Sequence, residues 1–75
     1  MATELFSPWG GAVGWRSQYG TGFQVVAQLD DLSIWYRGPD CQVVEREFYT
    51  ACRQTFLRRF FPWLKRPPAE LILDA

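Results

Sequence analysis

Basic and aromatic side chains are concentrated in one stretch of the chain, between Arg53 and Arg66. This stretch holds five of the eight basic residues and four aromatic residues, and it contains no acid. Guanidinium and ammonium groups bind carboxylates and phosphates, while aromatic rings add apolar contact area. The first functional hypothesis is therefore an anionic or aromatic-rich partner.

The residue types that most enzymes need are scarce. The chain has no histidine, which removes the commonest general base and the commonest metal ligand. Cys41 and Cys52 are eleven positions apart. That spacing is about 16 Å along a helix, too far for a disulfide, and two cysteines alone make no zinc-binding pattern. No phosphate-binding glycine motif occurs. We predict no catalytic site, no metal site and no cofactor, and thus a protein that is not an enzyme.

Length and charge set further bounds. A length of 75 residues allows one small domain. The formal net charge of zero does not favour a general nucleic-acid binder. Two cysteines are too few for the disulfide framework of a small secreted domain. No apolar run approaches the roughly 18 residues needed to span a bilayer. We expect a soluble, cytoplasmic protein.

Apolar and polar residues alternate with a period of two over residues 12–37, with breaks at Gly20-Thr-Gly22 and Asp30-Asp31. This pattern predicts a three-stranded antiparallel sheet. A two-residue turn at Asp30-Asp31 would pair Leu29 with Leu32, although a longer loop or a slipped register is the alternative. The expected inner face consists of Val13, Trp15, Tyr19, Phe23, Val25, Ala27, Leu29, Leu32, Ile34 and Tyr36.

A helix is predicted over residues 41–61, with Asp40 as its N-cap and Pro62 as its interruption. On a helical wheel one side forms a core-facing stripe. The stripe consists of Val44, Phe48, Ala51, Cys52, Thr55 and Phe56. Residues 1–11 are rich in Pro and Gly and predict an N-terminal arm in which Trp9 packs back onto the domain. Residues 62–75 predict an extended tail, in which 70–74 either forms a short fourth strand or pins the tail to the core.

The predicted fold is therefore α+β, a three-stranded antiparallel meander packed on one C-terminal helix, in a single domain over residues 1–75. Two surfaces are candidates for binding a partner. The first is the C-terminal half of the helix with the residues that follow it. Leu57 and Phe61 lie opposite the core stripe there, so one sheet cannot easily bury both sets. The candidate residues are Arg53, Leu57, Arg58, Phe61, Trp63, Lys65 and Arg66.

The second candidate surface is the outer face of the sheet, with Trp35, Arg37 and Arg16. An exposed Trp beside Arg residues is typical of an interface hot spot or a base-stacking platform. Structural explanations stand beside both surfaces. The negative end of the helix dipole favours the cations near the helix terminus. The N-terminal arm with Trp9 would equally well cover Trp35.

The absence of catalytic groups and the surplus of aromatics favour a non-enzymatic protein–protein interaction module. Such a module would be an accessory or regulatory subunit or an inhibitor, and its partner would be another protein or a second copy of the chain. The first alternative is a nucleic-acid-binding domain that uses the sheet and helix Arg and Trp residues. A membrane-surface element over residues 53–66 ranks lowest, because Pro62 breaks the amphipathic helix it would require.

Overall fold

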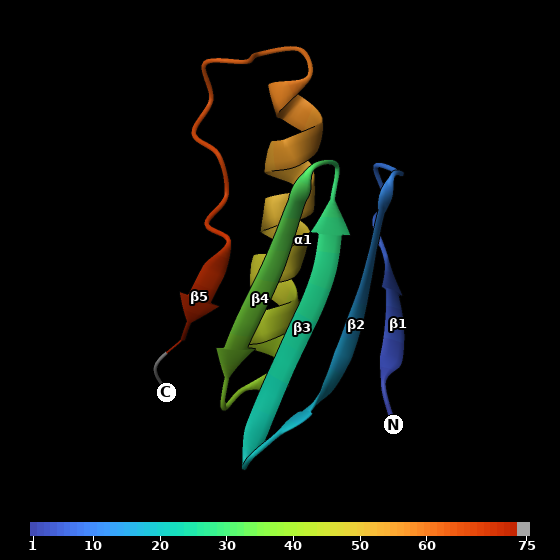
Figure 1. Ribbon diagram of the computed structural model, residues 1–75, viewed down its shortest axis with the longest axis vertical. Helices are drawn as coiled ribbons and strands as arrows, with labels where there is room; N and C mark the ends of the chain where they lie inside the picture. The colour runs from blue at the N-terminus through green and yellow to red at the C-terminus, as the bar shows by residue number, and fades with distance from the viewer. Residues whose placement is uncertain (74–75) are drawn as a thin grey trace.

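The computed structural model describes residues 1–73 and has an α+β fold, in which one helix covers one face of a five-stranded sheet (Figure 1). The elements are β1 (Thr3–Phe6), β2 (Ala12–Tyr19), β3 (Gly22–Leu29), β4 (Leu32–Gly38), α1 (Cys41–Arg58) and β5 (Glu70–Ile72). Sheet order follows chain order, and neighbours are antiparallel except β5, which runs parallel to β4. The predicted fold class is confirmed, although the sheet is wider than the predicted meander.

The β3–β4 hairpin has the predicted register. Leu29 pairs with Leu32, and the pairing continues down both strands to Val25 and Tyr36. Asp30 opens the two-residue turn with a φ of 53°. Asp adopts this left-handed conformation at lower cost than most residues, since its short polar side chain bonds locally. Both strands therefore direct alternate apolar side chains towards α1.

The prediction for the inner face of β2 was wrong. The β2–β3 turn contains only Gly20 and Thr21, so Tyr19 pairs with Gly22, and Trp15 lies opposite Val26. A one-residue change in register moves every side chain of a strand to the opposite face of the sheet. As a result Ala12 and Gly14 face α1, whereas Val13, Trp15 and Tyr19 lie on the other side.

The predicted N-terminal arm contains a strand. Residues Thr3–Phe6 pair with the first half of β2 as β1, and Leu5 is buried against the core. Gly10 and Gly11, both with positive φ, form the connection to β2. Trp9 packs against the core, as expected. The prediction of an arm was based on the glycine and proline residues of the connection, and it missed the four-residue edge strand that precedes them.

The helix begins where it was predicted to begin and ends earlier. Asp40 Oδ1 accepts hydrogen bonds from the backbone N–H groups of Gln42 (2.9 Å) and Val43 (3.4 Å), which satisfies two unpaired donors of the first turn. Regular helix stops at Arg58 and not at residue 61, because Pro62 has no N–H for the Arg58 carbonyl and its ring would clash with that carbonyl in a continued helix.

The core lies between α1 and the inner side of the sheet. Four residues of the predicted helix stripe are buried there: Val44, Phe48, Ala51 and Cys52. The sheet contributes Leu5, Ala12, Val25, Ala27, Leu29, Ile34 and Tyr36. Leu71 and Leu73 pack at the edge of this core. A short strand was one of two predictions for residues 70–74, and the structure has strand β5 at Glu70–Ile72. Residue 74 lies outside the described range.

Candidate functional site

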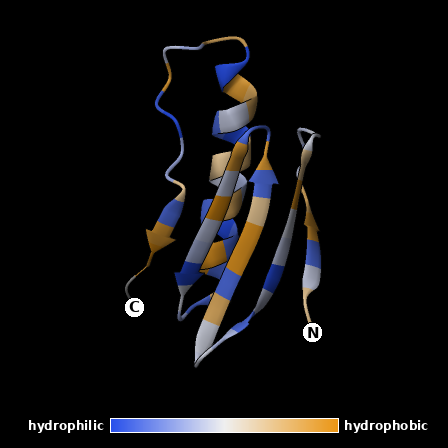
Figure 2. Cartoon of the chain, viewed as in Figure 1, coloured by the Kyte–Doolittle hydropathy of each residue, from blue (hydrophilic) through white to orange (hydrophobic). Residues whose placement is uncertain are grey.

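The side of the sheet away from α1, which we call the open face, carries a row of large apolar side chains across the three central strands. Trp15, Val26 and Trp35 are cross-strand neighbours, and the two Trp side chains are 45% and 43% exposed. Phe6, Tyr19 and Ile72 add exposed apolar area to the same face. Figures 1 and 2 view the molecule from this side, where the sheet lies in front of α1 and no helix or loop covers it.

Acidic residues end the central row on both edges of the sheet. Glu4 of β1 pairs with Trp15, and Glu70 of β5 pairs with Trp35, so the row reads Glu-Trp-Val-Trp-Glu from β1 to β5. With strands about 4.8 Å apart, the two Trp Cα atoms are about 10 Å apart and the two acids about 19 Å apart. The central row is therefore apolar in its middle, and its two acids lie at the edges of the sheet.

Polar side chains on either side of this row are already bonded to one another. Arg37 Nε donates to Gln24 Oε1 at 3.2 Å, and the Arg37 guanidinium lies 4.4 Å from the ring centre of Tyr19. Ser33 Oγ donates to Gln28 Oε1 at 2.6 Å. These contacts link polar side chains of neighbouring strands on both sides of the central row.

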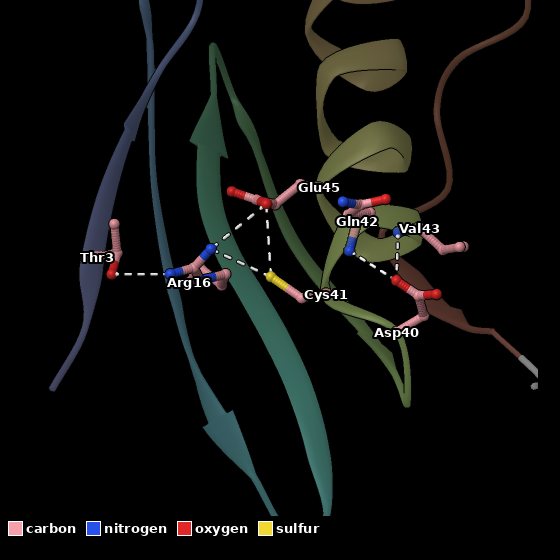
Figure 3. Close-up of polar contacts among 7 residues, drawn as sticks. All are labelled: Thr3, Arg16, Asp40, Cys41, Gln42, Val43 and Glu45. Atoms are coloured by element: carbon pink, nitrogen blue, oxygen red, sulfur yellow. Dashed lines mark hydrogen bonds and ion pairs between the residues drawn. The ribbon is translucent and has the colours of Figure 1, made fainter.

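Trp35 and Arg37 lie on the open face as predicted, whereas Arg16 does not. Arg16 lies on the helix side of the sheet, since the register of β2 differs from the predicted one. Its Nη1 is 3.4 Å from Glu45 Oε2 and donates to Cys41 Sγ at 3.1 Å (Figure 3). Its Nη2 donates to Thr3 Oγ1 at 3.2 Å. Arg16 thus ties β1 and β2 to the first turn of α1, and it is not placed to contact a partner on the open face.

A second exposed aromatic group lies at the far end of the molecule, on the connection between α1 and β5. We call residues 59–69 the distal loop. In Figure 1 this loop extends beyond the β3–β4 turn, at the opposite end from the start of β1. Phe60, Phe61 and Trp63 are all exposed, Trp63 by 77%, and the rings of Phe61 and Trp63 meet edge to face at 5.4 Å.

Much of the predicted basic cluster anchors the distal loop. Arg59 bonds Asp30 at 2.8 Å and Arg66 bonds Asp31 at 2.5 Å, so the two acids of the β3–β4 turn hold both ends of the loop. Arg58 also donates to the backbone carbonyl of Leu64. Exposed ion pairs contribute only about 0–1 kcal/mol each. Together, these contacts attach the loop to the β3–β4 turn and to the end of α1 and leave its aromatic residues exposed.

The remaining residues of this predicted surface are only partly brought together. Arg53 is exposed on α1, Leu57 is half-buried, and Lys65 is exposed on the loop. A pocket of about 240 Å³ beneath the loop is lined by five charged and four uncharged residues, and four of the charged side chains form ion pairs with one another. The residues predicted at the helix end therefore divide into loop anchors, Arg58 and Arg66, and outward-facing groups, among them Phe61, Trp63 and Lys65.

Two buried groups have strongly altered acidity. Desolvation, with a smaller contribution from the charges of Glu47 and Cys52, raises the pKa of Tyr36 from 10.0 to about 12. Desolvation likewise raises the pKa of Cys52 from 9.0 to about 11. The Tyr36 hydroxyl donates to the Pro68 carbonyl at 2.9 Å. These shifts stabilise the uncharged forms of both groups, which is typical of structural core residues and opposite to the activation of a nucleophile.

Neither a metal-binding cluster nor a membrane-spanning helix occurs in the part of the chain described. Residues 1–73 contain no group of three or more His, Cys, Asp or Glu side chains able to hold a metal ion. Within the same residues, no helix combines the length and the apolar character needed to cross a membrane.

The open face contains residues that sequence analysis did not assign to it. Trp15 and Tyr19 were expected in the core, and Phe6 was expected in an arm. The signal that could have placed Trp15 is the Gly20-Thr21 pair, because a two-residue turn there puts Trp15 opposite Val26. The pattern of β2 alone could not decide between its two faces, since both carry apolar residues.

The chain was compared with protein-family models, curated proteins and solved structures. None of the three comparisons finds a match.

Proposed function

We propose that this chain is a small non-enzymatic protein–protein interaction module whose main docking surface is the open face of the sheet. The observation that carries the proposal is the row formed by Trp15, Val26 and Trp35, which is central, apolar and covered by no element of residues 1–73. Sheets in stable domains bury an apolar face against another layer. A contiguous exposed apolar patch on a small protein typically marks an interaction site, and Trp is enriched at hot spots.

The charge of the open face supports a protein partner over a nucleic acid. Its charged side chains are Glu4, Glu70 and Arg37, which sum to −1. Acids at both edges repel phosphates, and the one arginine is already bonded to Gln24. A protein surface with an apolar centre matches this arrangement better, since the acids would then remain solvated at the rim.

Photo-cross-linking in cells tests this proposal. A photoreactive benzoylphenylalanine in place of Trp35 should form adducts with protein, because a docked partner lies within reach of this side chain. The matched control carries the same group in place of Thr50, which is exposed on the opposite side of the molecule, and should form few adducts. Absence of protein adducts at Trp35, with the folded protein present, would overturn the proposal.

The distal loop supports a second candidate function, contact with an anionic membrane surface. Its exposed aromatic residues lie in a projecting loop, and Lys65 on the same loop is exposed and forms no ion pair within residues 1–73. Aromatic rings favour the headgroup region of a bilayer, and each nearby cation contributes about 1 kcal/mol on an anionic surface. The loop supplies this surface without the amphipathic helix that Pro62 interrupts.

Vesicle cosedimentation tests the second candidate. The protein should bind vesicles that contain phosphatidylserine more tightly than vesicles of phosphatidylcholine alone, and Trp63→Ser should weaken that binding by about 10-fold. Trp35→Ser, which removes a Trp from the open face, should leave it unchanged. Equal binding to both vesicle types, or none, would reject the membrane candidate. If the protein bound single-stranded oligonucleotides and not vesicles, the loop would instead support the nucleic-acid hypothesis.

A further inference from the structure

We infer that the partner of the open face is a second copy of this chain, stacked face to face as a two-sheet sandwich. The inference rests on the proposed function and names the occupant of the same surface. Three properties of the open face support it: its symmetry, its charge and its size.

The first property is the symmetry of the central row. The sequence Glu4-Trp15-Val26-Trp35-Glu70, taken across the strands, reads the same in both directions about β3. An interface between identical copies must be complementary to itself about a two-fold axis. An axis that passes between the sheets at Val26 brings Val against Val and Trp against Trp. Binding to an unrelated protein would not require the row to be symmetric.

The second property is the charge. The protein has a formal net charge of zero, so two copies approach without overall repulsion. The acids at the two ends of the row lie at the solvated rim. Because these carboxylates stay in contact with water, solvent and salt weaken the repulsion between the acids of the two copies. Between these acids the central row contains no charge.

The third property is the size of the surface. The three central strands have seven or eight residues and the edge strands four and three, so at about 4.8 Å between strands and about 3.3 Å per residue the face covers roughly 500 Å² for each copy. Stacking two such faces buries about 1,000 Å² or more in total, the size at which specific interfaces begin. Twisted sheets pack in this way with their strands at about −30° to each other. The open face is therefore large enough for a reversible dimer.

Sedimentation equilibrium of the purified full chain, from micromolar to submillimolar concentration, tests the inference. The protein should be a dimer. Val26→Lys and Val26→Glu should each weaken self-association by about 100-fold or more, because each places two like charges together at the centre of the interface. An equimolar mixture of the two variants should associate again, since Lys then meets Glu across the axis. Trp63→Ser, on the distal loop, should dimerise as the unmodified chain does.

Circular dichroism melting of each variant separates loss of association from loss of folding. A monomeric unmodified protein at submillimolar concentration would overturn the inference, and so would a Val26→Lys variant that remains a dimer. The cross-linking experiment at Trp35 distinguishes this failure from failure of the proposed function. Adducts with a different protein alone would reject the dimer and retain the interaction module, whereas no protein adducts would reject both.

Discussion

Phe48→Ala is expected to remove most of the stability of this protein. Phe48 is fully buried at the centre of the core, between α1 and the middle of the sheet. Its ring packs against Gly14 of β2, where the absence of a side chain leaves room for it. Truncating a buried Phe typically costs about 3–5 kcal/mol, through lost burial and an unfilled cavity. A 75-residue domain has roughly 4–11 kcal/mol in total. Urea unfolding followed by circular dichroism measures the change.

The matched control is Phe60→Ala, the same substitution in the distal loop. Phe60 is mostly exposed and meets mainly the ring of Phe56, so its loss should cost less than about 1 kcal/mol. Equal costs for the two variants would contradict the position of α1 on the sheet.

A companion substitution, Gly14→Val, tests which side of β2 faces the helix. A Cβ atom at Gly14 would lie 2.8 Å from Cε1 of Phe48 and 3.2 Å from Cβ of Ala27. Overpacking of this kind costs about 1–3 kcal/mol. If Gly14 lay on the open face instead, Val would be tolerated or would stabilise the strand. Replacing Phe48 with Leu should relieve part of the Gly14→Val penalty.

Alkaline pH is expected to unfold the protein through two buried groups. Tyr36 and Cys52 have pKa values raised from 10.0 to about 12 and from 9.0 to about 11. At a pH between the unfolded and the folded pKa of each group, the unfolded chain has released a proton that the folded chain retains. The stability due to each group is therefore complete below about pH 9 and is lost as the pH rises to the folded pKa. The loss is on the order of 2–3 kcal/mol for each group.

Tyr36→Phe provides the control for this pH dependence. At neutral pH the variant should be about 1 kcal/mol less stable, because the hydrogen bond to the Pro68 carbonyl is lost. As the pH rises past 11 its stability should approach or exceed that of the unmodified protein, since it has no phenol to ionise. Urea midpoints measured from pH 8 to about 12 would reveal this crossing. Parallel curves for the two proteins would rule out Tyr36 as a source of the alkaline instability.

Parts of the fold were predictable where local signals agree with one another. The β3–β4 hairpin was predicted with its register, because both strands alternate about a turn that Asp30-Asp31 can form. The start of α1 and its buried stripe were predicted from Asp40 and from the spacing of apolar residues. In these segments the nearest neighbours in sequence decide the structure.

The candidate surfaces were predicted only in part. Trp35 and Arg37 were assigned to the exposed sheet face, Phe61 to the side of the helix opposite the core stripe, and Trp63 to the residues that follow the helix. Arg16 was placed on the wrong side of the sheet, and Trp15 was placed in the core. Both errors have one origin, the length of the β2–β3 turn, because a shift of one residue exchanges the two faces of a strand.

The sequence by itself determined the elements that depend on local chemistry: alternating strands, a capped helix, and a helix end near Pro62. The tertiary structure decided between a two-residue and a three-residue β2–β3 turn, and with it which side of β2 faces α1. The ring of Phe48 needs the space that Gly14 leaves, and Arg16 meets Glu45 on that side. It also decided that Arg59 and Arg66 bind the aspartates of a distant turn. These are contacts between residues far apart in the chain, and no local pattern encodes them.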